Sequence, residues 1–244
     1  MVYDLANEQN DYSAFSFKNG EETHPTEVLK WGINRYYPKI AIASSFNVED
    51  IVLIDMATQI EPAIKVFYID TGFHFKETEA IKKLIKKRYR LNLVEYSPLL
   101  SIEDQNLKYG PELYKENPDL CCKLRKVEPI KRALRELDAW VTGLRREQAV
   151  TRKGTKTVES GYTDEGNPLI KMNPLAHWTS QQVWEYLENN QIPYNPLLDK
   201  GYLSIGCEPC TRPIQQGEDR RAGRWAGTDK TECGIHTFMK KDES

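Results

Sequence analysis

The sequence has 244 residues, of which 39% are hydrophobic and 29% charged, and its formal net charge at pH 7 is −2. This length suffices for one large α/β domain, and the near-neutral charge gives no reason to expect nucleic acid or an anionic membrane as a partner. No secretory leader or membrane-spanning apolar run is recognisable, so we expect a cytoplasmic protein whose five cysteines serve metal binding or redox chemistry rather than disulfides.

Strand and helix patterns alternate along the chain. In chain order they are a helix at 26–37, a strand at 39–44, a helix at 51–59, a strand at 63–69, a helix at 75–90, a strand at 91–96, a helical stretch at 113–137 interrupted near Pro118, a strand at 139–142 and a capped helix at 179–189. Strands separated by helices predict a parallel, doubly wound sheet of the α/β class. Such sheets bind ligands at the carboxyl ends of their strands.

The connection after the first strand is a candidate anion site. Ser44 and Ser45 offer hydroxyl donors, and the start of the next helix near Asp50 directs backbone N–H groups to the same place. The glycines and the Lys-Ser/Thr ending of the nucleoside triphosphatase P-loop are missing, which excludes that loop. Residues 70–72, Asp-Thr-Gly, end the second strand and are expected at the same edge.

Basic side chains gather near the cysteines in sequence, at 123–135, 145–156 and 212–224, which favours an anionic small ligand. The polar segment 149–167 is predicted to form a loop or a hairpin over the site. Beyond residue 213 the composition changes: Trp225 is the only large apolar residue between positions 215 and 231. We therefore expect a mobile tail that closes over the site.

Two cysteine pairs organise the sequence. Cys121-Cys122 and the Cys207/Cys210 pair are separated by 84 residues and together supply four thiolates, enough for an iron-sulfur cluster or a structural zinc. Cys233 is left over, in an arginine-rich part of the chain that favours a reactive thiolate. The pattern predicts four cysteines that hold a cofactor and a fifth that reacts.

An ordered set of motifs carries a family resemblance. The motifs are Tyr-Ile-Asp-Thr-Gly at 68–72, Cys-Cys-x-x-Arg-Lys at 121–126, Thr-Gly-x-Arg-Arg at 142–146, Gly-Cys-Glu-Pro-Cys-Thr-Arg-Pro at 206–213 and Glu-Cys-Gly-Ile-His at 232–236. Over about residues 39–237 the chain resembles the assimilatory adenylyl-sulfate (APS) reductases of the iron-sulfur type, which are relatives of the phosphoadenylyl-sulfate (PAPS) reductases.

This resemblance implies a fold of the adenine nucleotide α-hydrolase type and one 4Fe-4S cluster on Cys121, Cys122, Cys207 and Cys210. It implies reduction of APS to sulfite and AMP in sulfate assimilation and cysteine biosynthesis. Cys233 is expected to attack the sulfur and form an S-sulfocysteine, which thioredoxin or a similar dithiol then reduces. The implied organisation is an N-terminal segment (1–25), a nucleotide-binding domain with the cluster (26–213) and a catalytic tail (214–244). We expect a homo-oligomer.

The substrate-binding residues implied by the resemblance are mostly basic. They are Ser44, Ser45, Asp50, Lys126, Arg145, Arg152, Arg221, Arg224 and His236. Lys126 follows Cys122 by four residues, so on an α-helix one turn would link the cluster to the substrate. His236 is expected to orient the substrate or the thiolate. Asn47-Val48 replaces the Gly-Ala of many relatives, and asparagine tolerates the left-handed backbone that the loop would need.

Three alternatives stay open at this point. The first is an enzyme that uses PAPS instead of APS, or uses both, and Asn47 and the loop 148–156 would decide between these substrates. Family members limited to PAPS typically lack the four cysteines, which favours APS. The second is a tRNA-thiolating enzyme of the same fold, which needs a Ser-Gly-Gly-Lys-Asp-Ser loop and a basic RNA-binding surface that this sequence lacks. The third is a non-catalytic binding module stapled by zinc, for which the adjacent pair Cys121-Cys122 is awkward geometry.

Overall fold

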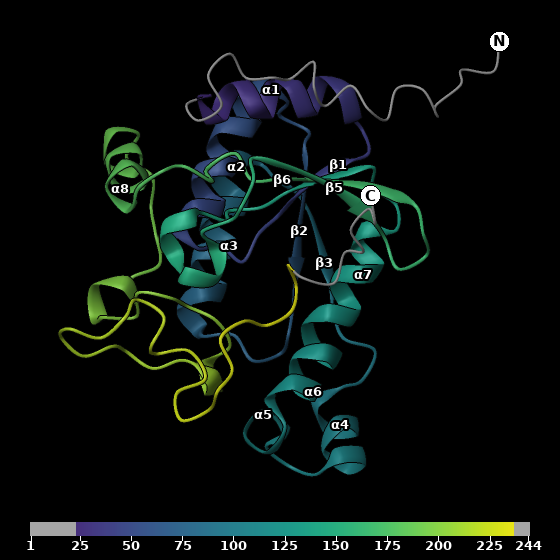
Figure 1. Cartoon of the computed structure of the whole chain (residues 1–244), viewed down its shortest axis with the longest axis vertical. Coiled ribbons are helices and arrows are strands. Elements are labelled where there is room, and N and C mark those ends of the chain that lie inside the picture. The colour runs from purple at the N-terminus through teal and green to yellow at the C-terminus, as the bar shows by residue number, and fades with distance from the viewer. Residues whose placement is uncertain (1–22, 237–244) are drawn as a thin grey trace.

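A six-stranded sheet forms the centre of the computed structural model, which describes residues 23–236 (Figure 1). The strands are β1 (Ile40–Ala43), β2 (Lys65–Ile69), β3 (Asn92–Tyr96), β4 (Ala139–Val141), β5 (Val158–Tyr162) and β6 (Pro168–Met172). Their order is β3-β2-β1-β4-β6-β5, and every neighbouring pair is parallel except the antiparallel pair β5–β6. The predicted α/β fold with a parallel sheet is confirmed, with one antiparallel strand added at an edge.

Helices cover both faces of this sheet. They are α1 (Pro25–Tyr36), α2 (Val48–Ile60), α3 (Lys76–Tyr89), α4 (Ile102–Tyr109), α5 (Leu113–Glu116), α6 (Pro118–Cys122), α7 (Glu128–Leu134) and α8 (Ser180–Asn189), with a π-helical turn (Lys123–Val127) between α6 and α7. Helices α1 and α2 pack on β1, and α8 packs on α2, whereas α7 packs against β2 and β3. None of the helices within residues 23–236 is long and apolar enough to cross a bilayer. Most of the predicted N-terminal segment, 1–22, and the last part of the tail, 237–244, lie outside the described residues.

Side chains alternate between two hydrophobic cores along the central strands. Ile42 of β1 and Val66 of β2 belong to the core that contains α2. Phe67 of β2 and Trp140 of β4 belong to the other core, with Ile130 of α7. Because successive side chains of a strand point to opposite faces, each central strand serves both cores.

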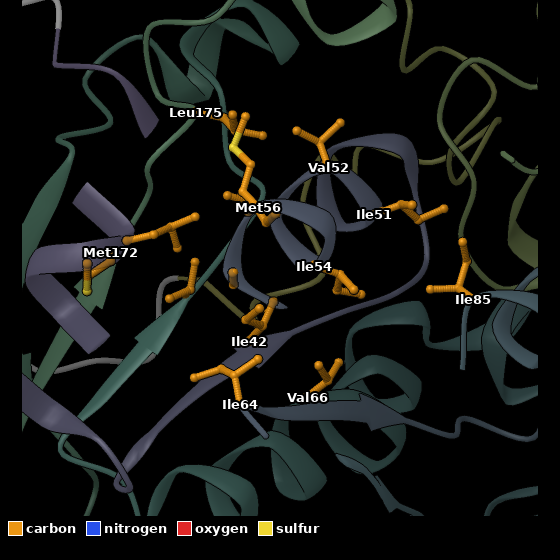
Figure 2. Packing of buried hydrophobic residues seen from close by; sticks show 14 of the residues in the cluster. Ile42, Ile51, Val52, Ile54, Met56, Ile64, Val66, Ile85, Met172 and Leu175 are labelled. Carbon is orange, nitrogen blue, oxygen red and sulfur yellow. The ribbon is translucent and has the colours of Figure 1, made fainter. Parts of the chain in front are cut away.

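Helix α2 is buried on all sides, since every residue from Val48 to Ala57 is buried. A helix surrounded in this way belongs to the interior of a domain. Figure 2 shows Ile42 of β1 below α2, and Ile51, Ile54 and Met56 of α2 belong to the same buried cluster. This packing fixes the N-terminus of α2 next to the carboxyl end of β1.

The polar segment 149–167 was predicted to form a loop or a hairpin over the site. Its second half instead forms β5, which pairs with β6 at the edge of the sheet, and β6 pairs with β4. Lys171, in the middle of β6, is buried, and its Nζ lies 3.4 Å from Oε1 of Glu159 in β5. A lysine interrupts the apolar run expected of a buried strand, which hides β6 from a search for such runs. The part of the segment that precedes the hairpin carries Arg152 and lies at the site described below.

The long helical stretch predicted at 113–137 is divided into several pieces. Pro118 starts α6, and the Asn117 side chain accepts the first-turn N–H of Leu120 at 2.9 Å. Pro129 lacks an N–H, and its ring would clash with the carbonyl of Arg125 in a regular α-helix. The chain widens there into a π-helical turn, in which the N–H of residue 128 donates to the carbonyl of residue 123. Lys126 therefore follows Cys122 along a π-helical turn, which is wider than the α-helical turn expected, and both residues line the same pocket.

Candidate active site

Loops that follow β1, β2 and β4 surround a cavity of about 200 Å³. Ser44 comes directly after β1, Thr71 lies just beyond β2, and Thr142 comes directly after β4. Strand β1 lies between β2 and β4, where the strand order reverses direction. Doubly wound sheets bind ligands outside the carboxyl ends of the strands at such a switch point, so this cavity is the candidate site.

The loop after β1 is closed by its own hydrogen bonds. The backbone N–H and the hydroxyl of Ser45 donate to Asp50 Oδ2 at 2.7 and 2.9 Å, and the Phe46 N–H donates to Ser44 Oγ at 3.0 Å. Phe46 has φ 57°, whereas Asn47 is extended, with φ −74°. The expectation that Asn47 supplies the left-handed residue is therefore wrong. Its side-chain amide instead donates to Ser45 Oγ at 2.8 Å, which steadies the loop.

Asp50 is a buried carboxylate beside this loop. Burial raises its pKa from 3.8 to about 6, although the hydrogen bonds from Ser45 favour the ionised form. Asp50 is thus protonated more easily in the folded chain than in the unfolded chain. Protonated Asp50 therefore stabilises the folded state relative to the unfolded state. This stability is fully present below about pH 4 and is lost as the pH rises through about 6.

Asp50→Asn should remove this pH dependence. From pH 4 to 7, the free energy of unfolding of the wild type should fall relative to the variant by at most about 3 kcal/mol, and the difference should then stay constant. Urea denaturation of both proteins at several pH values measures it. A constant difference over the whole range would show that Asp50 keeps an ordinary pKa.

Arg145 is completely buried and faces carboxylates instead of the cavity. Its Nε and Nη2 donate to Glu49 Oε1 at 3.1 and 2.8 Å, and its Nη1 donates to Glu147 Oε2 at 2.8 Å. Nη1 and Nη2 also meet the Trp178 carbonyl and the Ser180 hydroxyl, so all five donors are used. Arg145 is absent from the wall that residues 23–236 form around the cavity. Arg145 can affect a ligand in the cavity through Glu49, which does line it.

A close approach at Gly143 joins this ion pair to the loop after β1. A Cβ on Gly143 would lie 2.5 Å from Asp50 Oδ1 and 2.9 Å from Glu49 Cβ, so only glycine lets the loop after β4 come so near. Burial would raise the pKa of Glu49, but Arg145 and Arg220 outweigh it and lower the pKa below its ordinary value. Glu49 is therefore ionised and fixed.

Within residues 23–236, five cationic side chains do line the cavity, namely Lys126, Arg152, Arg220, Arg221 and Arg224. Arg220 was not among the residues predicted from the sequence. Burial, and next the neighbouring charge of Arg152, lower the pKa of Arg221 to about 10. The guanidinium of Arg224 lies 4.4 Å from the centre of the Trp225 ring. These contacts hold the cations in a part of the cavity suited to an anion.

Residues 214–236 fold back onto the domain instead of extending from it. The Trp225 N–H donates to the Cys210 carbonyl at 3.0 Å, and Thr211 forms a bridge with Arg224. Trp225 is buried, which the polar composition of this segment did not predict. The last described residues reach the cavity, where Cys233 and His236 form part of the wall.

His236 lies half-buried at one end of the cavity. Its ring stacks on Trp140 with centroids 6.0 Å apart and an interplanar angle of 14°. Burial, followed by the charges of Lys171 and Arg152, lowers the pKa of His236 well below 6.5, so the ring is neutral.

Cys121, Cys122, Cys207 and Cys210 line a second, smaller pocket beside the cavity. Lys126 and Cys207 belong to the walls of both pockets. Burial alone would raise the pKa of Cys207, but Lys126 and a hydrogen bond from Thr71, whose Oγ1 lies 3.4 Å from the sulfur, lower it. Within residues 23–236, no three His, Cys, Asp or Glu side chains are grouped closely enough to hold one metal ion. The four thiols therefore share a pocket without meeting at a single point.

The structure thus brings most of the predicted site residues to one cavity and the predicted metal ligands to the pocket next to it. The predicted residues on the cavity wall are Ser44, Ser45, Asp50, Lys126, Arg152, Arg221, Arg224, Cys233 and His236. Sequence reasoning missed Arg125, which lines the cysteine pocket and donates from Nε to the Thr71 carbonyl at 2.5 Å. Arg125 follows Cys121 by four residues, and this spacing is the sequence signal that could have identified it.

Comparisons with known proteins agree with this geometry. The family model described as "Phosphoadenosine phosphosulfate reductase domain" matches residues 39–213. The adenosine 5'-phosphosulfate reductase of Halalkalibacterium halodurans is 46% identical over 217 residues, 88% of this chain and 93% of that protein. The enzyme of the same name from Bacillus cereus is 44% identical over 230 residues, 94% of this chain and 96% of that protein.

Solved structures show the same fold. The phosphoadenylyl-sulfate (PAPS) reductase from Candida auris, solved as a phosphate complex, is 34% identical, with a TM-score of 0.67 over 77% of this chain and 90% of that one. The FMN adenylyltransferase of Candida glabrata, at 18% identity, has a TM-score of 0.56 over 78% of this chain and 64% of that one, which indicates a shared fold alone. From the matched model and these relatives, the chain belongs to the phosphoadenosine phosphosulfate reductase family and groups there with the adenosine 5'-phosphosulfate reductases.

Proposed function

We propose that this protein is an oxidoreductase that reduces adenosine 5'-phosphosulfate (APS) to sulfite and AMP, with thioredoxin or a similar dithiol as electron donor. One observation carries the proposal: Cys233 shares a cavity at the switch point of the sheet with Lys126, Arg152, Arg221 and Arg224. A nucleophile surrounded by fixed cations suits attack on a sulfate group, whose negative charge otherwise repels a thiolate. The activity named for the relatives at 46% and 44% identity agrees with it.

The proposed reaction proceeds in two stages. The Cys233 thiolate attacks the sulfur atom, the bond from sulfur to the phosphate oxygen breaks, and AMP leaves with the electron pair. The Cys233 S-sulfonate remains. A thiolate of the dithiol then attacks Cys233 Sγ and releases sulfite, and the second thiol resolves the mixed disulfide to free Cys233 and an oxidised donor. The dithiol supplies the two electrons that reduce the sulfur.

The cavity residues receive distinct roles in this proposal. The cations Lys126, Arg152, Arg221 and Arg224 bind the phosphosulfate, and the first serine of the loop after β1, Ser44, directs its hydroxyl to the same anion. Ser45 and Asp50 shape that loop through their mutual hydrogen bonds. Arg145 acts indirectly, by fixing Glu49. A neutral His236 is suited to orient the substrate or the thiolate, but not to bind an anion as a cation.

As part of the proposal, Cys121, Cys122, Cys207 and Cys210 hold one 4Fe-4S cluster. Four thiols that line one pocket suit a cluster of several iron atoms, whereas the adjacent pair Cys121-Cys122 is awkward geometry for a single tetrahedral zinc. Arg125 and Lys126 beside the pocket would balance the negative charge of a thiolate-bound cluster. When bound, the cluster would supply a fixed charge next to Lys126 and thereby tune the site. The zinc-stapled binding module is disfavoured for the same reasons.

The main competing function is reduction of PAPS, which the 34% identical Candida auris enzyme favours. Anaerobic assays of cluster-loaded protein with thioredoxin, comparing sulfite release from APS and from PAPS, separate the two. We expect kcat/KM for APS to exceed that for PAPS by at least about a hundredfold. The reverse order would make the protein a PAPS reductase, and no sulfite from either nucleotide would refute both functions. A cytoplasmic location, where five free thiols stay reduced, and a homo-oligomeric state complete the proposal.

A further inference from the structure

The side chain of Glu232 binds two of the arginines assigned above to the anion site. Arg152 donates from Nε to Glu232 Oε1 and from Nη2 to Oε2, both at 2.8 Å. Arg221 donates from Nη2 to Oε2 at 3.2 Å and to the neighbouring Thr231 carbonyl at 2.9 Å. One carboxylate therefore joins two cations on the cavity wall.

This arrangement is the one in which an arginine binds a phosphate or a sulfate. The edge of Arg152 formed by Nε and Nη2 makes two parallel hydrogen bonds, as it would to an anionic ligand. Both arginines and Glu232 are largely buried, with side chains that are 13%, 14% and 21% exposed. Because solvent screens such a site only weakly, two neighbouring guanidinium groups are costly without an anion between them.

Glu232 also controls where the nucleophile lies, because it directly precedes Cys233. Cys233 and Ile235 line the cavity, and Ile235 packs against the core that contains Trp140. The tail therefore occupies part of the space that a nucleotide would need. A ligand that binds Arg152 and Arg221 has to displace the Glu232 carboxylate. The further polar contacts described for residues 232–236 are longer: Thr151 Oγ1 donates to Glu232 Oε1 at 3.3 Å, and Lys171 Nζ donates to the His236 carbonyl at 3.5 Å.

We propose that Glu232 is a positioning residue whose carboxylate occupies the anion subsite of Arg152 and Arg221 until the anionic part of the substrate displaces it. The displacement frees the tail and moves Cys233 at the moment the substrate arrives. The identity of the displacing anion rests on the proposed function, whereas the contact between Glu232 and the two arginines does not. Loss of the carboxylate charge therefore loosens the tail in the free enzyme and leaves both arginines open to a ligand.

Glu232→Gln tests this, with Glu218→Gln as the matched control. Glu218 makes an equally short pair with Arg212, two contacts of 2.8 Å, in the same part of the chain but away from the cavity. In cluster-loaded protein without nucleotide, iodoacetamide should alkylate Cys233 about tenfold faster in Glu232→Gln than in wild type, as read by peptide mass spectrometry. The control should react at the wild-type rate. Glu232→Asp, which keeps the charge, should restore part of the protection.

Binding of AMP supplies a second readout that a merely structural role would not move. Calorimetry should show about tenfold tighter AMP binding in Glu232→Gln, because no carboxylate competes for the arginines. In turnover, KM for APS should fall without a rise in kcat. Unchanged alkylation, or AMP binding that is unchanged or weaker, would overturn the proposal. The rate of alkylation is measured without turnover. A protein that fails to reduce APS therefore refutes the proposed function, and the alkylation rates then decide the role of Glu232.

Discussion

Cys233→Ser should reduce sulfite release from APS by at least about a thousandfold, because a serine hydroxyl cannot form the S-sulfonate intermediate or be attacked by a dithiol. Wild-type protein mixed with APS in the absence of reductant should gain the mass of one sulfonate, and the variant should gain none. Intact mass spectrometry under anaerobic conditions measures both. Addition of thioredoxin should remove the adduct from the wild type and release sulfite.

The control for this experiment is the iron content of the variant. Cys233 lines the cavity but not the cysteine pocket, so iron bound per chain should be the same in both proteins. Wild-type rates in Cys233→Ser with normal iron content would remove Cys233 from the mechanism. An adduct on a different cysteine would move the nucleophile to that residue.

Cys207→Ser should have the second largest effect, because Cys207 belongs to both pockets. The loss of one of the four proposed thiolate ligands should release most of the bound iron, and sulfite release should fall by at least about a hundredfold. Iron analysis and the visible absorption of the purified protein measure the first effect, and turnover measures the second.

Thr71→Val is the matched variant. It removes the hydroxyl 3.4 Å from the Cys207 sulfur but leaves all four thiols in place, so iron should be retained. Full iron content in Cys207→Ser would mean that this residue is not a ligand. Loss of iron in Thr71→Val would mean that the position of the thiol, and not its presence alone, controls the site.

The central part of the fold could be predicted because its signals are local. The apolar runs that became β1 to β4 needed no knowledge of distant residues. Strand β6 could not be found in this way, because the charge of Lys171 is compensated by Glu159 on another strand. Helix α4 was not predicted, although its sequence carries a local signal. Ser101 is a favourable N-cap residue, and its hydroxyl accepts the N–H of Asp104 at 3.0 Å.

The candidate site shows the same division. Residue types were sufficient to select Lys126, Arg152 and Cys233, all of which reach the cavity. They were insufficient for Arg145, because its partner Glu49 lies 96 residues away in the sequence and no local pattern predicts that pair. The binding of Glu232 to Arg152, 80 residues away, is hidden for the same reason. Long-range charge pairing decides which arginines remain available, and it becomes visible only in the fold.

The order of the strands also bears on how the protein behaves at high concentration. Strands β3 and β5 are the outermost of the sheet, and an outer strand can pair with a strand of another molecule and start aggregation. Strand β5 contains Gly161, which favours strand pairing poorly, and β3 exposes Asn92 and Glu95. Both edge strands therefore disfavour pairing with a strand of another molecule. Any stable contact between copies of this chain should be made by helices or loops, and the sheet should stay six strands wide.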